Sequence, residues 1–505
     1  MNHRREFLIV ILIISIAAFF RLYKLDVYPP GLYPDEAMNG NNAIQARETG
    51  DYKIFYPENN GREGLFIAIQ SLSIRVFGNT PFALRVVSAI AGILTVLGLY
   101  LLTRTLFNWE VAAIASFLMA VGFWPVMFSR IGFRAIMSPM LIVWGTYFFW
   151  RGLVSAKLRN FAVSGLIWGL GFYTYISHRI MPLMLVSTLL AYWQAIRRDF
   201  SYDRYIHGRN KLVEGFALFM LVVIVVVLPL AWHFYVYPED FLGRLNKVSV
   251  FSADNPVLTI IKNFGKTLGM FIFVGDHNWR HNIAGRALLF LPVGFFAVLG
   301  FFKTILKLER SRKQHGHFSP PHTLLLSWFF LGLLPVVFST EGIPHALRAI
   351  VVSPVVFIFA AEGLWWMFEY ARSHQHREHH LARSGVAAFA VTVLLLSIGA
   401  YEFKTYFYDW APRQEVRDEF NQNYIDVASR LLALPQSKVK YVLVNRDTGV
   451  QVNGIPVTAQ TVMYLTDTWT TEKQRLKNIF YLTEDQYRRR QYLPNAIIIP
   501  LEEKK

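Results

Sequence analysis

Two adjacent acids, Asp35 and Glu36, stand in a polar stretch, residues 32–64, directly after the first strongly apolar segment of the chain. Acids, amides and glycines fill this stretch, although 54% of the chain is hydrophobic and only 17% is charged. One interpretation is structural: Pro34 begins an amphipathic helix, and acids are favoured at the positive N-terminal end of a helix. A helix start alone, however, does not account for the polar groups that the sequence places elsewhere.

Four further segments join Arg, His or both to the edges of apolar segments. A single Arg at such an edge is usually a side chain that extends its charge to the membrane surface. Four such groups opposite an acidic pair favour a binding site, because Arg offers a planar fork of donors for phosphate oxygens and His adds a hydrogen bond or a proton. The array indicates a phosphate beside a carboxylate at the membrane boundary, as in a lipid phosphate that bears a sugar. The segments are SRIGFRA (residues 129–135), YISHRI (175–180), GDHNWRHN (275–282) and IPHALRA (343–349).

The composition indicates a membrane protein, because soluble proteins carry roughly a quarter of charged residues. A helix needs about 20 apolar residues to cross the hydrocarbon core of a bilayer, and about eleven segments meet this need. The net charge of +17 suits anionic headgroups and cytoplasmic loops and does not indicate nucleic acid. The absence of Cys excludes disulfides and thiolate metal sites. We expect spans near residues 7–25, 82–103, 109–128, 132–150, 161–176, 180–196, 213–235, 286–304, 323–340, 347–368 and 385–402.

Basic residues predict the orientation of these spans. If the N-terminus is cytoplasmic, the inner loops carry most of the Lys and Arg, whereas the short outer loops hold one or two each. We therefore expect a protein of the inner or plasma membrane whose first outer loop is residues 26–81 and whose second long outer loop is residues 237–285. An odd number of spans places the tail outside the cytoplasm as well.

The tail changes composition and is expected to be a separate domain. Residues 415–435 have helical spacing, and residues 440–445 and 495–500 have the pattern of short buried strands. The predicted domains are a transmembrane domain, 1–402, and a soluble domain, 403–505. The predicted fold class is an all-α polytopic membrane protein of about eleven transmembrane helices with a small α/β extracytoplasmic C-terminal domain. The His-rich segment at residues 373–380 is expected to be a solvated loop rather than a metal site.

The motifs of the chain resemble the C-type membrane glycosyltransferases. An acidic pair in the first outer loop, many helices beyond it and an outer C-terminal domain are similar to that superfamily. More narrowly, four segments are similar to bacterial phospholipid-carrier-dependent glycosyltransferases, relatives of the protein O-mannosyltransferases and the lipid A aminoarabinose transferases. The resemblance covers roughly residues 5–400 and leaves the tail unmatched. The segments are ALRVVSAIAGILTVLGLYLLTRTLF, FSRIGFRAIMSPML, LGFYTYISHRIMP and HALRAIVVSPV.

This resemblance implies an enzyme that moves a hexose or pentose from a polyprenyl-phosphate donor to an acceptor hydroxyl or similar nucleophile at the outer face of the membrane. Asp35 matches the first-loop acid of the family and is the expected general base of a single, inverting displacement. Glu36 is expected to orient the acceptor or a sugar hydroxyl, or else to be structural. Arginines stabilise the charge that grows on the phosphate. The expected phosphate-binding residues are Arg179 and Arg348, followed by His178, His345, Arg130 and Arg280.

The expected partners are the polyprenyl-phosphate sugar, membrane lipids and a glycan, lipid or protein acceptor, without nucleic acid. No cofactor is expected to be required, because the many Arg and His residues can neutralise a phosphate without a metal. Some relatives in the superfamily do place a divalent cation between carboxylates and phosphate. The residues that could contribute to such a site are Asp35, Glu36, Glu63, Asp276 and Glu341.

Two other classes of protein fit part of the pattern. A transporter or flippase of lipid-linked sugars also needs many helices and an arginine-lined phosphate site, but it usually has polar residues along its spans and access to both faces. Here the polar groups collect at one face. A sensor or scaffold that only binds a lipid phosphate explains the arginines but gives Asp35 no role.

Overall fold

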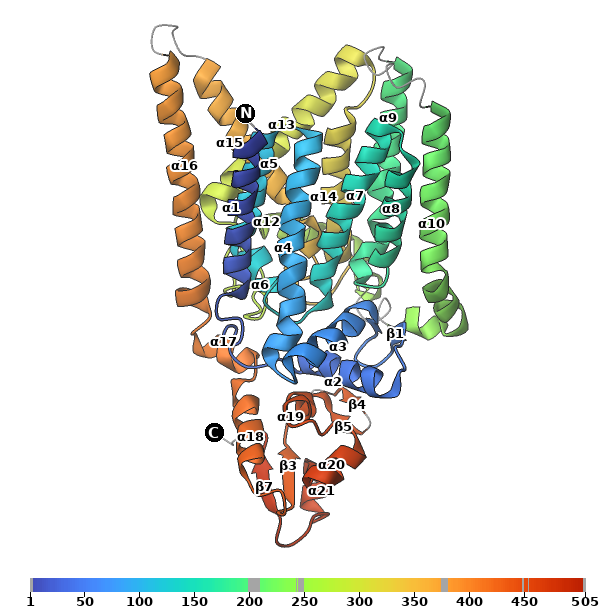
Figure 1. The fold of residues 1–505 in the computed structure, drawn as a ribbon, viewed down its shortest axis with the longest axis vertical. Helices are drawn as coiled ribbons and strands as arrows, with labels where there is room; N and C mark the ends of the chain where they lie inside the picture. The colour runs from blue at the N-terminus through green and yellow to red at the C-terminus, as the bar shows by residue number, and fades with distance from the viewer. Residues whose placement is uncertain are drawn as a thin grey trace. The chain divides into compact units, whose positions relative to one another are not determined.

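The computed structural model divides the chain into two compact units, and its ribbon is drawn in Figure 1. The helical unit comprises Met1–Tyr23, Ile90–Ser129 and Arg134–Tyr406. The α/β unit comprises Lys24–Ala89, Arg130–Phe133 and Phe407–Lys505. The residues that the structure describes are 3–198, 209–241, 243, 249–373, 380–446, 449–452 and 454–502.

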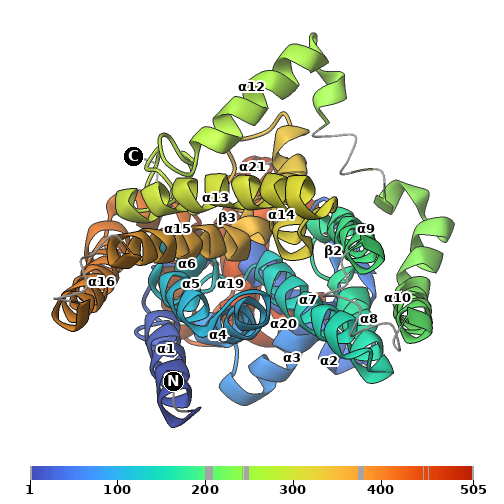
Figure 2. The same ribbon diagram turned by 90° about the horizontal axis from the view of Figure 1, so that it is seen from above.

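The helical unit is built from long apolar helices that pack in pairs. In the view from above, α13 and α15 lie side by side, and α8 lies between α7 and α10 (Figure 2). Further contacts join α5 to α15 and α9 to α14. The helices are α1 (His3–Leu22), α4 (Pro81–Leu106, which begins in the α/β unit), α5 (Trp109–Val121), α6 (Phe123–Phe128), α7 (Met137–Ser155), α8 (Leu158–Gly171), α9 (Pro182–Arg198), α10 (Arg209–Val236), α12 (Pro256–Gly269), α13 (Leu291–His315), α14 (Pro320–Val337), α15 (Ser353–Ser373) and α16 (His380–Lys404).

Glycines allow the closest of these helix pairs. A Cβ atom at Gly300 of α13 would lie 1.8 Å from the carbonyl oxygen of Phe359, and one at Gly363 of α15 would lie 2.1 Å from that of Phe296. The two backbones therefore touch at these positions. Small residues permit this approach, and the close packing that follows stabilises helix pairs in a bilayer.

Among the described residues, seven helices are long and apolar enough to cross a membrane. They coincide with seven of the predicted spans, so the chain is a multi-pass membrane protein. The other four predicted spans overlap α1, α5 with α6, α7 and α8, which are shorter, less apolar or flanked by charged residues. The predicted number of eleven is not confirmed. The seven are Pro81–Leu106, Ile176–Arg198, Lys211–Val236, Leu291–His315, Pro320–Val337, Ile350–Arg372 and Gly385–Trp410.

The α/β unit combines the first loop with the C-terminal residues. The first loop forms α2 (Pro34–Thr49), the short strands β1 (Phe55–Tyr56) and β2 (Arg62–Glu63), and α3 (Leu65–Phe77). The C-terminal part contains α17 (Gln414–Glu419), α18 (Gln422–Ala433), β3 (Lys440–Val444), β4 (Gln451–Val452), β5 (Ile455–Pro456), α19 (Gln460–Thr466), α20 (Thr471–Lys477), β6 (Ile479–Thr483), α21 (Glu484–Arg488) and β7 (Ile497–Pro500).

A three-stranded parallel sheet in the order β6-β3-β7 organises the C-terminal part. The central residue Val442 pairs with Tyr481 on one side and with Ile499 on the other. Strands β3 and β7 match the two strands that the sequence pattern predicts, and α18 lies within the predicted helical segment. Tyr424 and Leu431 of α18 pack on the sheet in one buried apolar cluster.

Helix α19 packs on α2 and so joins the two parts of the α/β unit. Asn41 of α2 donates hydrogen bonds to both the backbone and side-chain oxygens of Gln460, at 3.1 and 2.9 Å. Thr461 donates to the carbonyl oxygen of Leu32 at 2.8 Å. A Cβ atom at Gly40 would lie 2.5 Å from the ring of Tyr464, so the ring lies directly on the α2 backbone. The predicted boundary between residues 402 and 403 remains a prediction, although the contacts group residues 24–89 with the C-terminal residues. Most of the His-rich segment, residues 374–379, and residues 242 and 244–248 of the second long loop lie outside the described residues.

Candidate functional site

Asp35 lies in the first turn of α2, directly after Pro34. Its side chain is half-buried, and Asn59 Nδ2 donates a hydrogen bond to Asp35 Oδ1 at 2.8 Å. Within the described part of the chain, Asp35 Oδ2 has no hydrogen-bond partner. The N-terminal end of a helix favours negative charge, so the first turn of α2 is a favourable place for this carboxylate.

The turn between β1 and β2 presents Asn59 to Asp35. Asn59, Asn60 and Gly61 have φ angles of +54°, +65° and +81°, a left-handed run that Asn and Gly adopt more readily than other residues. Gly61 is required on a second ground, because a Cβ atom there would lie 2.5 Å from the ring of Phe55. The sequence Asn-Asn-Gly therefore fixes the position of the amide that orients Asp35.

Glu36, the next residue, has a different environment. Its carboxylate forms a fully buried ion pair with Arg85, with 3.1 Å between Arg85 Nε and Glu36 Oε2 and 3.3 Å between Arg85 Nη2 and Glu36 Oε1. The backbone N–H of Gly132 also donates to Glu36 Oε2, at 2.6 Å. Arg85 donates its remaining hydrogen bonds to the carbonyl oxygens of Pro29 and Gly31. These contacts favour the structural alternative for Glu36, which holds the start of α2 against three neighbouring segments.

A second buried guanidinium, that of Arg62, joins the turn between β1 and β2 to α2. Arg62 donates to the side-chain oxygens of Asn39 at 2.7 Å and of Asn42 at 2.8 Å. These two asparagines are three residues apart and therefore lie on one face of the helix. Asn39 in turn donates to the carbonyl oxygen of Gly132 at 3.4 Å. Asp35 thus begins a helix that is held along its length.

Arg130, a predicted phosphate ligand, is buried in the α/β unit. Its guanidinium donates to the carbonyl oxygens of Lys24 at 3.1 Å and Tyr28 at 3.0 Å and lies 5.0 Å from the ring centre of Phe407. These contacts favour a structural role. Arg280 is less enclosed and donates through Nε to Asn278 at 3.3 Å within its own loop.

His178 is buried in the helical unit and also has structural contacts. Its Nδ1 lies 3.2 Å from Ser138 Oγ, and its Nε2 lies 3.3 Å from the carbonyl oxygen of Trp168. The ring packs on Gly171, where a Cβ atom would lie 2.0 Å from it. With both ring nitrogens occupied and no exposed surface, His178 is placed to fasten helices α7 and α8 rather than to meet a lipid phosphate.

Arg179, the next residue, is half-buried against aromatic side chains. Its guanidinium carbon lies 4.9 Å from the ring centre of Phe234 and 5.1 Å from that of Phe241. Stacking on rings orients a guanidinium through its face, so these aromatic side chains fix the position of Arg179.

Arg348 lies in the segment between α14 and α15. Its guanidinium donates to Glu341 Oε2 at 2.9 Å, to the carbonyl oxygen of Glu341 at 3.1 Å and to Ser339 Oγ. The side chain of Arg348 is 10% exposed, whereas that of Glu341 is 69% exposed. The carboxylate is the solvent-exposed member of this pair, so the ion pair is weak on the side of Glu341 and leaves room for a competing anion.

A third group of polar residues surrounds Asp276 in the helical unit. Asp276 Oδ2 lies 3.0 Å from His281 Nδ1 and 3.9 Å from His345 Nδ1 and accepts the backbone N–H of Ala346 at 2.8 Å. Burial of the carboxyl opposes its ionisation, but the hydrogen bond from His281 and the charges of His281 and His345 hold the pKa of Asp276 below its ordinary value. His345 and Arg348 belong to the same segment, so the Asp276 cluster adjoins the Arg348 pair.

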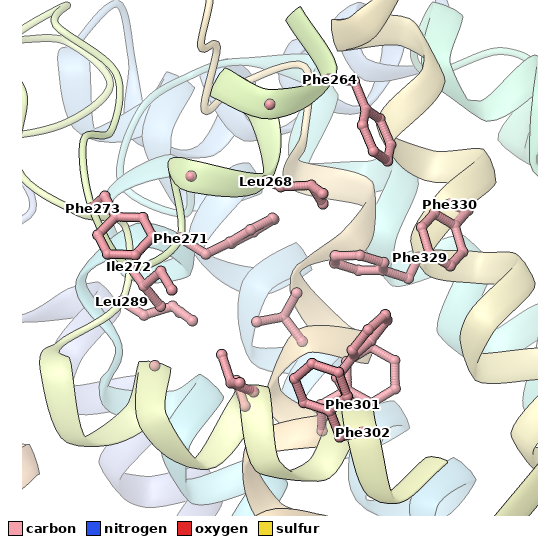
Figure 3. Close-up of a pocket in the computed structure, with 17 residues that line it drawn as sticks. Phe264, Leu268, Phe271, Ile272, Phe273, Leu289, Phe301, Phe302, Phe329 and Phe330 are labelled. Carbon is pink, nitrogen blue, oxygen red and sulfur yellow. The ribbon is translucent and has the colours of Figure 1, made fainter. Parts of the chain in front are cut away.

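The helical unit also contains an apolar cavity of about 540 Å³ (Figure 3). Every residue that lines it is apolar or glycine, and the rings of Phe301 and Phe329 point into it. The ring of Phe271 in its wall lies 5.9 Å from that of Trp124, which donates to the carbonyl oxygen of Ala346 at 3.1 Å. The apolar cavity and the Asp276 cluster are therefore neighbours within the helical unit. The lining comes from α12, residues 271–273, Leu289, α13, α14 and α15.

The structure brings together some of the predicted site residues and separates others. It places His345 near Asp276, and it buries His178, Arg130 and Glu36 among structural contacts. Several residues that complete these groups were not named individually in the sequence analysis: Asn59, Arg85, Ser339 and His281, the last of which lies in the quoted segment 275–282. The Asn-Asn-Gly run was a usable signal for Asn59, and an Arg at the edge of a span was a signal for Arg85.

Comparisons with known proteins agree with the resemblance that the motifs predicted. Residues 65–232 match the family model of the dolichyl-phosphate-mannose-protein mannosyltransferases. A putative mannosyltransferase of Bacillus subtilis, YkcB, is 25% identical over 199 residues, which are 37% of this chain and 27% of that protein. The chain thus aligns with about a quarter of the length of this relative.

Two solved structures show the fold. The oligosaccharyltransferase of Archaeoglobus fulgidus tethered to an acceptor peptide is similar with a TM-score of 0.57 at 14% identity, over 95% of this chain and 64% of that one. ArnT of Cupriavidus metallidurans bound to undecaprenyl phosphate is similar with a TM-score of 0.55 at 14% identity, over 97% and 92%. The resemblance to the C-type membrane glycosyltransferases is confirmed.

Proposed function

We propose that the chain is a glycosyltransferase that moves a sugar from a polyprenyl phosphate to an acceptor nucleophile, with Asp35 as the general base. The observation that carries this proposal is the state of Asp35: a half-buried carboxylate, oriented by Asn59 and left with one oxygen open. A protein that only binds or moves a lipid phosphate has no use for such a group. An enzyme that must remove a proton from an acceptor hydroxyl requires it.

The donor side of the proposal rests on the helical unit. A cavity lined by apolar side chains suits a polyprenyl chain, and Arg348 and Arg179 suit its phosphate. Of the predicted phosphate ligands, we retain Arg348 and Arg179, with His345 and Arg280 as neighbours that add charge. Solved proteins of this fold hold undecaprenyl phosphate and dolichol phosphate, which supports a carrier of this class.

The chemical step is a single displacement. The acceptor oxygen forms a bond to the anomeric carbon while the bond from that carbon to the phosphate oxygen breaks. The electron pair leaves with the polyprenyl phosphate, and Asp35 takes the acceptor proton. Attack opposite the leaving group inverts the anomeric centre. Arg348 would exchange Glu341 for the phosphate and stabilise the charge that grows on it.

Glu36 acts in this proposal as a positioning residue. Both of its oxygens are engaged by Arg85 and by the backbone N–H of Gly132, so it does not reach a substrate. Its role is to set the direction in which α2 begins and hence where Asp35 points. We also propose that the first loop and the C-terminal residues lie outside the cytoplasm, as the distribution of Lys and Arg predicts.

The test uses the purified full chain in liposomes with a labelled polyprenyl-phosphate sugar and a crude acceptor pool. Binding of the donor and covalent transfer are measured separately. For Asp35→Asn, transfer should fall by about 10²- to 10⁴-fold, the usual contribution of general acid–base catalysis, while the donor still binds.

The matched control is Asp51→Asn, which changes an exposed acid of the same loop and should transfer at the wild-type rate. Full transfer by the Asp35→Asn variant would remove Asp35 from the mechanism. Movement of the donor between leaflets without any new glycosidic bond, in the wild type, would identify a flippase instead.

A further inference from the structure

The Asp276 cluster brings one carboxylate and two imidazoles together in a nearly buried site. Asp276 and His281 are almost completely buried, and His345 is nearly so, with side chains 6%, 8% and 15% exposed. Within the described part of the chain, no Lys or Arg forms an ion pair with Asp276. Buried charged groups are normally paired or coordinate metals, and here the carboxylate and the two imidazoles have their ligand atoms directed at one small region.

We propose that Asp276, His281 and His345 bind Zn²⁺. Two imidazoles and one carboxylate form a ligand set that zinc accepts, with water in a fourth position. The three ligand atoms lie within 4.8 Å of one another. In a tetrahedral zinc site, bonds of about 2.0–2.2 Å place ligand atoms about 3.3–3.6 Å apart, between the 3.0 and 3.9 Å that separate Asp276 Oδ2 from His281 Nδ1 and His345 Nδ1.

The surroundings of the ligands suit a metal. Asp276 Oδ1 accepts the backbone N–H of Asn278, and Oδ2 accepts that of Ala346, both at 2.8 Å, so the carboxylate is already oriented by its outer shell. Hydrogen bonds of this kind orient metal ligands and tune their affinity. Zinc would take the place of the proton between Asp276 and His281, and that imidazole would bind as the neutral form.

The metal would fasten two segments that are far apart in the sequence. Asp276 and His281 belong to the loop between α12 and α13, and His345 lies three residues before Arg348, between α14 and α15. A zinc ion would hold the Arg348 segment against this loop. The site goes beyond the proposed transfer reaction, and no step of that reaction passes through it.

The experiment measures zinc in the purified full chain, prepared with an affinity tag that lacks histidine. After incubation with Zn²⁺ and removal of the unbound metal, elemental analysis should find one more zinc per chain in the wild type than in His281→Asn. Asn keeps a side-chain donor toward Asp276 but is a poor zinc ligand. The dissociation constant for zinc should rise by at least about 100-fold, since loss of mere outer-shell partners already costs 10- to 100-fold.

His277→Ala is the matched control, because His277 is an exposed histidine of the same loop and lies outside the cluster. It should bind zinc as the wild type does. The difference between variants also separates this site from the His-rich segment at residues 373–380, which all of them share. Equal zinc in the wild type and His281→Asn, or equal loss in both variants, would overturn the proposal.

A second measurement does not depend on how well a variant folds. Co²⁺ added to the wild type should give the visible absorption of a four-coordinate N/O site, and Zn²⁺ should abolish it by displacement. Zinc should also raise the melting temperature of the wild type, because it binds only the folded chain. Absence of a cobalt spectrum would contradict the site even if the variants failed to fold.

Discussion

Two aspartates, one in each unit, show how the surroundings of a carboxylate decide its use. Asp276 in the helical unit is buried and accepts hydrogen bonds from His281, Ala346 and Asn278. Asp35 in the α/β unit is half-buried, and Asn59 is its hydrogen-bond donor within the described residues. Buried polar groups must be satisfied by their neighbours, so an oxygen that remains open for a substrate occurs where solvent still reaches it. The comparison supports the proposal that Asp276 holds the structure and that Asp35 takes part in the chemistry.

The same contrast separates Asp35 from its neighbour Glu36. Consecutive residues of a helix point in directions about 100° apart, because a turn takes 3.6 residues. Glu36 therefore faces the interior and pairs with Arg85, while Asp35 faces the turn between β1 and β2 that carries Asn59. The two neighbouring acids therefore have different surroundings: Glu36 is fully ion-paired, and Asp35 accepts one hydrogen bond from Asn59 among the described residues.

The largest effect is expected when the buried ion pair between Glu36 and Arg85 is broken. Arg85→Ala should lower the free energy of unfolding of the α/β unit by about 3–5 kcal/mol, because it leaves the buried Glu36 carboxylate without its partner. Thermal unfolding in detergent and limited proteolysis measure the loss. Arg47→Ala, at an exposed position of α2, should change stability by less than about 0.5 kcal/mol. Equal stability of the two variants would mean that the ion pair does not hold α2.

A smaller effect is expected at Arg348. Arg348→Lys keeps the charge but loses the planar fork, so the dissociation constant for the polyprenyl-phosphate donor should rise by about 10-fold. Donor binding in liposomes measures it, and transfer at saturating donor should fall as well, because the fork stabilises the charge that grows on the phosphate. Arg312→Lys, at an exposed position of α13, is the control and should bind the donor normally. Wild-type donor affinity in Arg348→Lys would exclude Arg348 from phosphate recognition.

The smallest effect is expected at Asn59. Asn59→Gly keeps the left-handed backbone and removes the donor to Asp35. A single hydrogen bond contributes about 1 kcal/mol, so the turnover rate should fall by about 5-fold. Asn60→Gly changes the next residue of the same left-handed run and should leave turnover unaffected. If the two glycine variants behaved alike, the effect would belong to the turn and not to the orientation of Asp35.

The sequence predicted the features that depend on local pattern. Apolar runs marked the long helices, short runs with the pattern of buried strands marked β3 and β7, and Pro34 with two acids marked the start of α2. The resemblance to the C-type membrane glycosyltransferases, carried by motifs rather than by any single fingerprint, is confirmed by the comparisons.

Features that depend on distant contacts were not predictable in this way. The packing of Tyr464 on Gly40 joins segments more than 400 residues apart and has no local signature. The burial of His178 against Gly171 is likewise invisible in a motif that places His beside Arg. Helices α5 and α8 are shorter than the length that a membrane-spanning helix needs. Many of their residues are buried against other parts of the protein, and a length criterion applied to the sequence does not register that packing.

The central claim is that this chain forms a glycosidic bond and uses Asp35 to do so. Mass spectrometry of the glycans, glycolipids and glycoproteins of cells that produce the wild type, no chain, or Asp35→Asn tests it most directly. The account predicts an acceptor that gains the mass of one hexose or pentose, or of a modified form of either, with the wild type and lacks it in the other two. Identical spectra from all three, or the same product with Asp35→Asn as with the wild type, would contradict it.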